Sequence, residues 1–331
     1  MDVLSQAVIG SSLSQSFAND KSKQLSALII GALAGMSPDL DVLINSNKDP
    51  LLFLEFHRQF THSLIFIPFG ALICALFFYV FFKNKLTFSQ IYLFSFLGFA
   101  THGLLDSCTS YGTQLFWPFS NDRVSWSVVS IVDPFFTIPI LIGIWIAAYR
   151  NNRVIARATF LYAVIFLSLG LVQKQRAENA LNNLVQQRGH QAERALVKPS
   201  FANRHVWKLV YEYNDHYYVD AVKLLSSAEI IQGTSIKKIN VVNDLPWLNK
   251  NNQQAKDIER FRWFSGDFLA LKPGSDNIIF DVRYSFLPND ISLMWGIELN
   301  KESAGDTHVN FVSNRGSSRP EERKKFINML F

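Results

Sequence analysis

Long apolar stretches separated by short polar loops dominate the first half of the chain. Each stretch comes close to the roughly 20 residues that a helix needs to cross a bilayer. They are Leu25–Ile44, His62–Phe82, Phe88–Leu105, Val128–Tyr149 and Val154–Val172. A shorter apolar stretch, Val3–Phe17, is interrupted by Ser and Gln and fits a short inserted or an interfacial helix. The pattern predicts an α-helical integral membrane domain of five to six helices.

The second half follows a different pattern. Gln173–Arg194 is polar and suited to continuing the last apolar helix out of the membrane. Val206–Tyr213 and Tyr217–Leu225 are rich in β-branched and aromatic residues and flank Asn214-Asp215-His216, which predicts a hairpin. A helix is expected within Asn249–Phe264. Further strands are expected at Phe268–Lys272, Ile278–Phe286, Leu293–Leu299 and His308–Val312. We therefore predict a small α+β, mainly antiparallel, domain.

Charge divides the chain at the same place. Residues 1–173 hold only 10 of the 32 Lys and Arg and 9 of the 27 Asp and Glu, as expected where charge is costly. We predict a membrane domain over 1–172, a helical linker over 173–198 and an extracytoplasmic domain over 199–331. The chain lacks a dense Lys/Arg run, so nothing favours nucleic-acid binding. Two cysteines are too few for a disulfide framework or a thiolate zinc site.

The basic residues of the short loops set the expected orientation. Cytoplasmic loops retain Lys and Arg, and all of these residues can lie on the cytoplasmic side of one alternating topology. They are Lys21, Lys23, Lys83, Lys85, Arg150, Arg153 and Arg157. The sequence thus predicts a multi-pass membrane protein with everything after Val172 outside the cytoplasm.

Histidines and acids of the membrane half gather on one side of this topology. Each lies at an outer-leaflet helix end or in an outer loop, although the Lys and Arg pattern made no use of them. They are Asp39, Asp41, His57, His62, His102, Asp106 and Asp133, with Arg58 beside them. For Asp133 alone, an interfacial residue and a member of the site both remain open. Arg58 fits a snorkelling or a phosphate-pairing cation.

The residue types favour a transition metal. His102 and Asp106 are four apart and share one face of a helix, whereas His57 and His62, five apart, converge only if the chain turns before Thr61. A mixed imidazole and carboxylate set suits zinc, manganese or iron better than magnesium or calcium, and has ligands for one or two ions. Such an ion lowers the pKa of bound water towards 7 and generates a hydroxide nucleophile.

Three motifs together resemble a known family. Pro38-Asp39-Leu40-Asp41, His57-Arg58-x-x-Thr61-His62-Ser63 and His102-Gly103-x-x-Asp106 are similar to motifs of the YdjM/YbcI-type (DUF457) bacterial inner-membrane proteins, which are described as metal-dependent hydrolases. The resemblance covers residues 1–172 and implies a helical metal site like that of zinc-dependent phospholipase C and P1 nuclease. It implies metal-ligand roles for Asp41, His57, His62, His102 and Asp106, with Asp39 as a second carboxylate.

One position departs from that family. Its members commonly carry a Thr-His pair in the first helix, where this chain reads Ser5-Gln6. If that His is a ligand, the chain has one ligand fewer.

The residues and the resemblance together predict a membrane-bound metal-dependent hydrolase that cleaves a phosphoester or other ester bond. Its substrate would be a lipid or lipid-linked molecule of the outer leaflet, with zinc as the favoured ion and Asp39 and Asp133 as catalytic residues. Two alternatives stay open. One is an amide-cleaving, ceramidase-like hydrolase. The other is a non-enzymatic sensor or assembly protein with a degenerate metal site.

Overall fold

The chain forms two compact units. The computed structural model describes residues 1–314 and 320–331. The first, here called the membrane unit, comprises Met1–Leu43, Phe56–Val172 and Phe201–Arg204. The second, the C-terminal unit, comprises Ile44–Glu55, Gln173–Ser200 and His205–Phe331. The hydrophobic pattern gave no indication that Ile44–Glu55 packs with the C-terminal unit.

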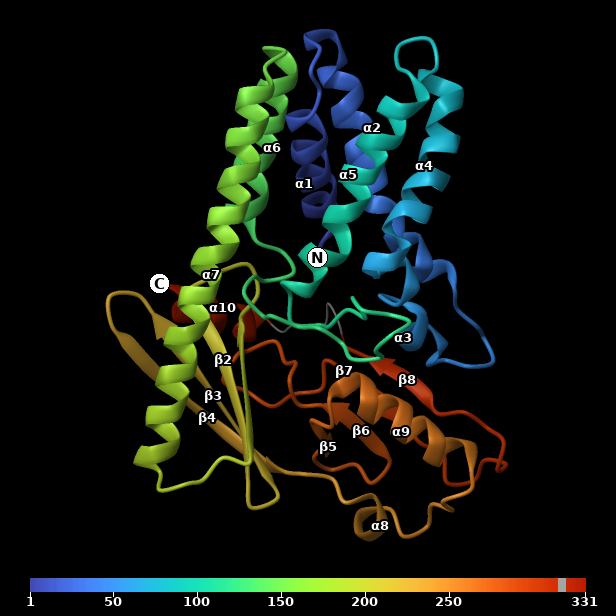
Figure 1. The fold of residues 1–331 in the computed structure, drawn as a ribbon. Coiled ribbons are helices and arrows are strands. Elements are labelled where there is room, and N and C mark those ends of the chain that lie inside the picture. Colours follow the sequence, from blue (N-terminus) through green and yellow to red (C-terminus); the bar gives the residue numbers. More distant parts are fainter. Residues whose placement is uncertain (315–319) are drawn as a thin grey trace. The chain divides into compact units, whose positions relative to one another are not determined.

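Helices build the membrane unit (Figure 1). The longer ones are α1 Val3–Ser16, α2 Gln24–Met36, α4 Ile67–Phe82, α5 Phe88–Ser107, α6 Pro134–Tyr149 and α7 Arg153–Gln187. Short 3-10 helices lie between them: η1 Lys21–Lys23, η2 Ser37–Leu43, η3 Phe60–His62 and η4 Leu64–Phe66. The short helix α3 Leu52–Phe56, except for Phe56, and the part of α7 from Gln173 onward belong to the C-terminal unit. Of the described helical segments, four are long and apolar enough to cross a membrane: Lys21–Leu43, Leu64–Phe82, Phe88–Ser107 and Arg153–Gln187. The helix α6 is apolar but shorter.

Local chemistry explains where two predicted helices differ from the observed ones. The helix expected from Val128 begins only at Pro134, because the backbone N–H groups of Val128 and Val129 bond to the carbonyl of Cys108 and Asp133 caps the helix. The last helix runs on past Val172 to Gln187, as the polar stretch predicted.

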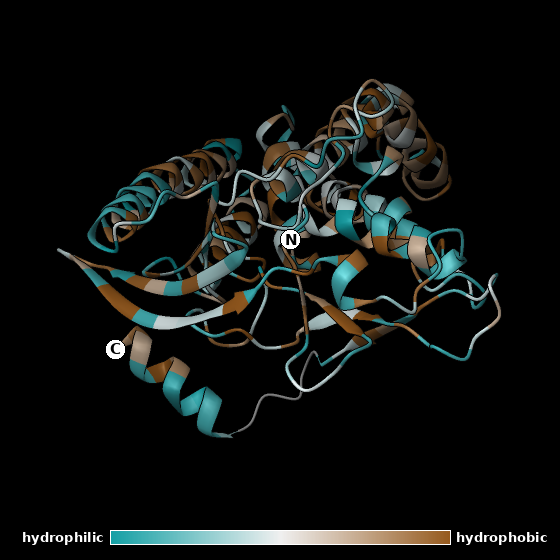
Figure 2. Ribbon diagram, turned by 90° about the horizontal axis from the view of Figure 1, so that it is seen from below, coloured by the Kyte–Doolittle hydropathy of each residue, from teal (hydrophilic) through white to brown (hydrophobic). Residues whose placement is uncertain are grey.

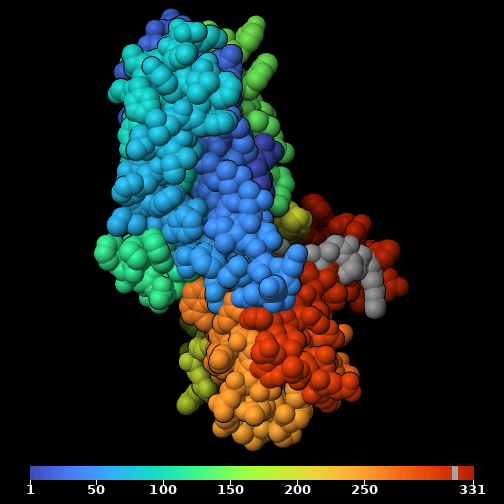
Figure 3. All heavy atoms as spheres, turned by 90° about the vertical axis from the view of Figure 1, so that its right-hand side faces the viewer, coloured from blue at the N-terminus to red at the C-terminus, as the bar shows by residue number. Residues whose placement is uncertain are grey.

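The membrane unit exposes apolar side chains and buries polar ones. On the face shown in Figure 3, the light blue surface of α4 presents large apolar residues that are more than half exposed: Phe69, Ile73, Phe77, Val80 and Phe81. Such a surface is suited to lipid. The helix α1 is the opposite case, since all of its serines and both of its glutamines are buried.

Small residues let the polar helix lie close to its neighbours. A Cβ on Gly10 would stand 2.5 Å from the carbonyl oxygen of Gly31, so α1 and α2 cross almost backbone to backbone. The buried hydroxyls use that proximity: Ser11 donates to the carbonyl of Leu28 at 2.9 Å and Ser14 to that of Phe94 at 2.9 Å. These bonds satisfy groups that lipid could not.

The C-terminal unit contains two four-stranded antiparallel sheets, which confirms the mainly antiparallel α+β prediction. The first sheet consists of β1 Arg194–Pro199, β2 Val206–Tyr213, β3 His216–Leu224 and β4 Ala228–Lys237. The second consists of β5 Leu269–Leu271, β6 Ile278–Asp281, β7 Trp295–Glu298 and β8 Asn310–Ser313. Its helices are α8 Val241–Asp244, α9 Gln253–Ser265 and α10 Pro320–Leu330. In Figure 2, α10 at the C-terminus carries hydrophobic residues among hydrophilic ones.

The predicted hairpin is present, and its turn follows from its residues. Asn214 and Asp215 both have positive φ angles, 49° and 56°, as a two-residue turn of the mirror-image type requires. The strands β1 and β4 were missed because neither shows a hydrophobic alternation; β4 is mostly exposed. The helix predicted over Asn249–Phe264 begins later, at Gln253, after its N-cap Asn252.

A buried lysine lies in the first sheet. Lys208 of β2 is 1% exposed, and its Nζ donates to Ser285 Oγ at 2.7 Å and to the carbonyl of Asp290 at 2.9 Å. Neither partner is a carboxylate side chain. Burial therefore lowers the pKa of Lys208 from its ordinary 10.5 to about 7.

This lysine predicts a pH-dependent stability. Between about pH 7 and 10 the unfolded chain binds more protons than the folded one, so the free energy of unfolding rises with pH in this window. Lys208→Met removes that part of the rise. Urea unfolding of the full chain, followed by hydrogen exchange in peptides of β2 and β3 at pH 7 and 9.5, measures the slope. The half-buried Lys223→Met is the matched control and keeps the wild-type slope; equal slopes in all three proteins would contradict the prediction.

Candidate metal centre

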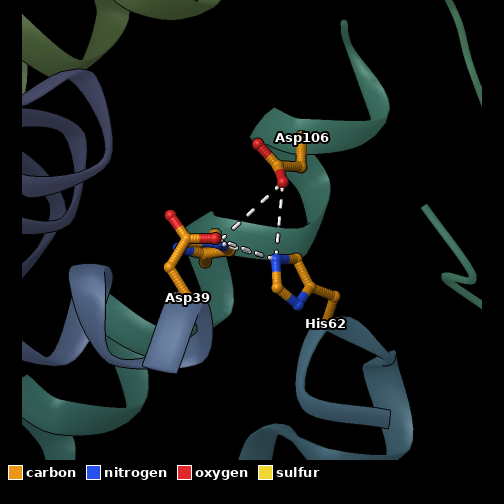
Figure 4. A group of neighbouring side chains, drawn as sticks. Asp39, His62 and Asp106 are labelled. Atoms are coloured by element: carbon orange, nitrogen blue, oxygen red, sulfur yellow. Dashed lines mark hydrogen bonds and ion pairs between the residues drawn. The ribbon is translucent and has the colours of Figure 1, made fainter. Parts of the chain in front are cut away.

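Four side chains from three parts of the membrane unit converge on one point. Asp39 comes from η2, His62 from η3, and His102 and Asp106 from successive turns of α5. Figure 4 shows Asp39, His62 and Asp106 pointing toward one another. Each of the four residues offers one ligand atom, and these atoms lie within 4.8 Å of one another.

The separations between these atoms fit a common ion. His62 Nε2 lies 2.9 Å from His102 Nε2, 3.4 Å from Asp39 Oδ1 and 3.4 Å from Asp106 Oδ2. His102 Nε2 lies 3.3 Å from Asp39 Oδ1. Ligands of a tetrahedral zinc ion, each about 2.0–2.1 Å from the metal, stand about 3.3 Å apart. Nitrogen and oxygen atoms at such separations match the distances between ligand atoms around a small cation.

The hydrogen bonds leave ligand atoms free on both histidines. His102 Nδ1 donates to the carbonyl of Gly35 at 2.5 Å, and a carbonyl can only accept. The proton is therefore on Nδ1, and the lone pair of His102 Nε2 faces the group. His62 Nδ1 lies 3.2 Å from Asp41 Oδ2, which orients the second imidazole in the same way. Carboxylates and carbonyls commonly hold metal-ligating histidines like this.

One carboxylate oxygen in the group lacks a hydrogen bond. Asp106 is fully buried, and its Oδ1 accepts from Gln6 Nε2 at 2.8 Å and from the amino group of Met1. Its Oδ2 has an ionic contact with Arg58 Nε at 3.0 Å but no hydrogen-bond partner in the described residues. A buried carboxylate oxygen without a donor is costly. A cation at the convergence point would supply the missing contact.

Asp41 is placed to organise the site. Its Oδ1 lies 2.7 Å from His57 Nδ1, and its Oδ2 accepts from the Thr61 hydroxyl at 2.7 Å and from the backbone N–H of Arg58 at 3.0 Å. The same carboxylate contacts His62. Asp39 Oδ1 and Asp106 Oδ2 each lie 3.4 Å from His62 Nε2, so three carboxylates surround this imidazole. The surroundings of His62 thus favour a positive charge such as that of a bound cation.

A second possible ligand group adjoins the first. Asp39, Asp41 and His57 also offer atoms within 4.8 Å of one another, so Asp39 belongs to both groups. His57 is the more accessible histidine, with 34% of its side chain exposed, whereas His62 and His102 are fully buried at the side chain. The first group is the better candidate for a metal site, because three of its four members are buried.

Backbone geometry brings the His62 turn against α5. A Cβ on Gly103 would lie 2.1 Å from the carbonyl oxygen of His62, so only glycine permits this approach. Arg58 adopts a φ of +68°, which is strained for a side chain of this size. Its N–H bonds to Asp41 and its carbonyl accepts from Gln114 N–H at 2.9 Å. These bonds hold the strained residue at the site.

The structure brings together six of the seven residues that the sequence singled out: Asp39, Asp41, His57, His62, His102 and Asp106. It leaves Asp133, for which a catalytic role was predicted, outside both ligand groups. Asp133 is buried and accepts hydrogen bonds from Phe135 and Phe136 N–H as the N-cap of α6. Its position gives it a capping role.

Two residues at the site had weaker sequence signals. Gln6 stands at the position where the family resemblance implies a histidine, and its Nε2 donates to Asp106 Oδ1, so this position does face the site. Arg58 was expected to snorkel or to pair with phosphate; it is 7% exposed, and its Nη1 reaches Thr109 Oγ1 at 3.3 Å. The histidines on either side of Arg58 were the signal for its position.

The four-residue group predicts metal binding that two histidines control. His62→Ala and His102→Ala each remove one imidazole from a buried site, so protein purified in detergent should lose its zinc, manganese or iron. Elemental mass spectrometry per chain measures this. Asp133→Asn is the control and keeps the wild-type metal content. Metal retained by both histidine variants would contradict the site.

Comparisons with known proteins agree with the membrane-spanning helices. The family model described as YdjM inner membrane protein matches residues 1–177. The uncharacterized protein YfhP of Bacillus subtilis (strain 168) is 26% identical over 196 residues, 58% of this chain and 58% of YfhP. The inner membrane protein YbcI of Escherichia coli (strain K12) is 28% identical over 155 residues, 45% of this chain and 84% of YbcI. No solved structure matches the chain. The family match covers more than half of the chain, which therefore belongs to the YdjM family of inner membrane proteins.

Proposed function

We propose that the protein is a membrane-bound, metal-dependent hydrolase that cleaves a phosphoester or other ester bond of a lipid or lipid-linked substrate. The observation that carries this proposal is the group of Asp39, His62, His102 and Asp106, whose ligand atoms converge at separations suited to zinc. A divalent transition metal held there would supply a hydroxide nucleophile at neutral pH. The chain's own residues would hold the ion and orient the substrate.

The depth of the group supports a lipid substrate. Asp39 lies near the end of the span Lys21–Leu43, and His62 lies two residues before the span Leu64–Phe82. His102 and Asp106 lie in the last turns of the span Phe88–Ser107. Alternating spans bring these ends to the same side of the bilayer, at the level where a lipid carries its ester and phosphoester bonds.

Access to the group is through Asp39. The side chain of Asp39 is 22% exposed, whereas those of His62, His102 and Asp106 are fully buried. Water and substrate therefore reach the ligand atoms from the side of Asp39. This carboxylate is also the group that we propose to accept a proton from the attacking water.

Arg58 favours a phosphoester over an amide or a neutral ester. Its guanidinium contacts Asp106 and Thr109, lies 5.4 Å from the centre of the Tyr111 ring, and has no hydrogen bond from Nη2 to any described residue. Arginine is suited to phosphate because its planar donors match phosphate oxygens. With a divalent ion in place, the ion and Arg58 would balance the negative charges of Asp39, Asp41 and Asp106. The site would then no longer repel an anionic substrate.

The side of the membrane follows from the loop charges. Retention of Lys and Arg on the cytoplasmic side would place the metal group at the outer leaflet and the C-terminal unit outside the cytoplasm. The partners that we propose are therefore lipids of the outer leaflet.

One observation favours a non-enzymatic second function. Gln6 contributes an amide to Asp106 at the position where the family resemblance implies a histidine, and an amide is a poor ligand for zinc. A membrane sensor or assembly protein with a degenerate site is the candidate that this substitution supports.

A direct assay tests the hydrolase. Purified protein in vesicles of mixed phospholipids, supplied with zinc or manganese, should release a phosphorylated headgroup or a diacylglycerol, detected by mass spectrometry. His102→Ala should lose this activity, and Asp133→Asn should keep it. Ceramide in parallel vesicles tests the amide-cleaving alternative. A metal-loaded chain that cleaves none of these lipids, nor lipid-linked phosphoesters, would contradict the proposal and favour the sensor or assembly function.

Arg58→Gln tests the choice of substrate. Loss of a positioned donor to a developing oxyanion costs about 10²-fold in rate, so phosphoester cleavage should fall by roughly that factor. Cleavage of a neutral ester should fall much less. Metal content, measured on the same samples, separates this effect from loss of the ion. Arg123→Gln, a partly buried arginine of the same loop region, is the control; an equal loss on both substrates would exclude a phosphate-specific role for Arg58.

A further inference from the structure

Two lysines and a serine form a second cluster of reactive groups, within the C-terminal unit. Lys198 of β1 and Lys208 of β2 are register partners in an antiparallel pair, so their side chains lie on the same face of the first sheet. Lys208 Nζ donates to Ser285 Oγ at 2.7 Å. Lys198 Nζ lies 3.6 Å from the centre of the Tyr284 ring, next to that serine. The cluster includes none of the candidate metal ligands.

Ser285 follows β6 on a segment that is held before and after it. On one side, Arg283 Nε and Nη2 donate to Asp281 Oδ1 and Oδ2 at 2.9 Å and 2.7 Å. On the other side, Asn289 Nδ2 donates to the carbonyl of Gln232 in β4 at 2.9 Å. These bonds fix the position of Ser285 against the first sheet.

The surroundings of Lys208 favour its neutral amine. The charged groups around it are Lys198, Asp281, Arg283 and Asp290. Burial has the largest effect and lowers the pKa of Lys208 to about 7, although Asp290 and Asp281 oppose it. Asp281 is itself paired with Arg283, which limits its effect on the lysine. Above this pKa most of the Lys208 side chain is neutral and carries a lone pair beside Ser285 Oγ.

The Ser285 hydroxyl has a proton to give to that lone pair. With Lys208 charged, the hydroxyl donates to the carbonyl of Leu287 at 2.6 Å. Loss of a proton from Lys208 lets the hydroxyl turn and donate to Nζ instead, which places a serine beside a general base. Ser285 is partly exposed and Lys208 is 1% exposed, so the serine is the more accessible member of the pair.

Backbone donors and apolar side chains adjoin the serine. The backbone N–H groups of Ser285 and Phe286 have no hydrogen-bond partner among residues 1–314 and 320–331. They are available to a carbonyl oxygen that becomes negative during a reaction. The ring of Phe286 lies 6.0 Å from that of Phe326. These neighbours suit an apolar acyl group better than a charged one.

We propose that Ser285 and Lys208 form a metal-independent catalytic pair that hydrolyses esters with a short apolar acyl group. Neutral Lys208 accepts the hydroxyl proton while Ser285 Oγ forms a bond to the acyl carbon. The bond from this carbon to the alcohol oxygen then breaks, and the alcohol leaves with the proton from Lys208. Water attacks the acyl-serine and gives a proton to Lys208, and the acid departs as Ser285 Oγ takes that proton back. This activity goes beyond the proposed function and does not depend on it.

A fluorophosphonate tests the nucleophile, because such a probe forms a stable covalent bond with an activated serine. The full chain in detergent, with EDTA to keep metal away, should take up a single phosphonate per chain. Peptide mass spectrometry should locate it on Ser285. Ser285→Ala should take up none. Ser275→Ala, which changes another partly buried serine of the same unit, is the matched control and should be labelled as the wild type is.

The rate of labelling tests the base. Lys208→Met should slow it about 10²-fold, as expected for loss of a general base, and Lys223→Met should not. In the wild type the rate should rise with pH and level off above about pH 7, once Lys208 is neutral. This profile needs no variant, so it tests the base even where Lys208→Met folds poorly.

Hydrolysis of p-nitrophenyl butyrate separates this pair from the metal centre. The activity should persist in EDTA and in His102→Ala, and should be lost in Ser285→Ala. A metal-dependent hydrolase would show the opposite pattern, so either proposal can fail without the other. The pair is contradicted by a wild type that neither takes up the probe at Ser285 nor cleaves the ester. Equal labelling rates in wild type and a folded Lys208→Met, or a rate that does not level off with pH, would also overturn it.

Discussion

The fully buried carboxylate of Asp106 is the constraint on which the membrane unit depends. A carboxylate without water at the end of a membrane helix is tolerated only with donors or cations around it. Arg58, Gln6 and the amino group of Met1 come from distant parts of the chain to meet it. They contact one oxygen of Asp106 and lie beside the other. That second oxygen, Oδ2, still lacks a hydrogen-bond partner among the described residues, and it lies at the place where His62 and Asp39 converge.

To bring these groups together, segments of backbone approach one another more closely than side chains normally permit. The turn that carries His62 rests on Gly103, and the carbonyl of Gly35 accepts the proton of His102 Nδ1. In a bilayer, close packing of small residues replaces the hydrophobic drive that holds helices together in water. The same glycines that bring the helices together therefore also set the orientation of the imidazoles. Packing and ligand geometry cannot be varied separately here.

The sequence predicted what depends on local pattern. Apolar runs indicated the spanning helices, and Asn214-Asp215 indicated the hairpin, because each is determined by neighbouring residues. Ionisable residues at the helix ends indicated the site. The sequence could not predict the different roles of Asp39 and Asp41. Both follow Pro38, and only the geometry of η2 places Asp41 beside Nδ1 of His62. The pairing of Arg260 with Glu55 joins residues 205 positions apart, for which a single sequence carries no signal.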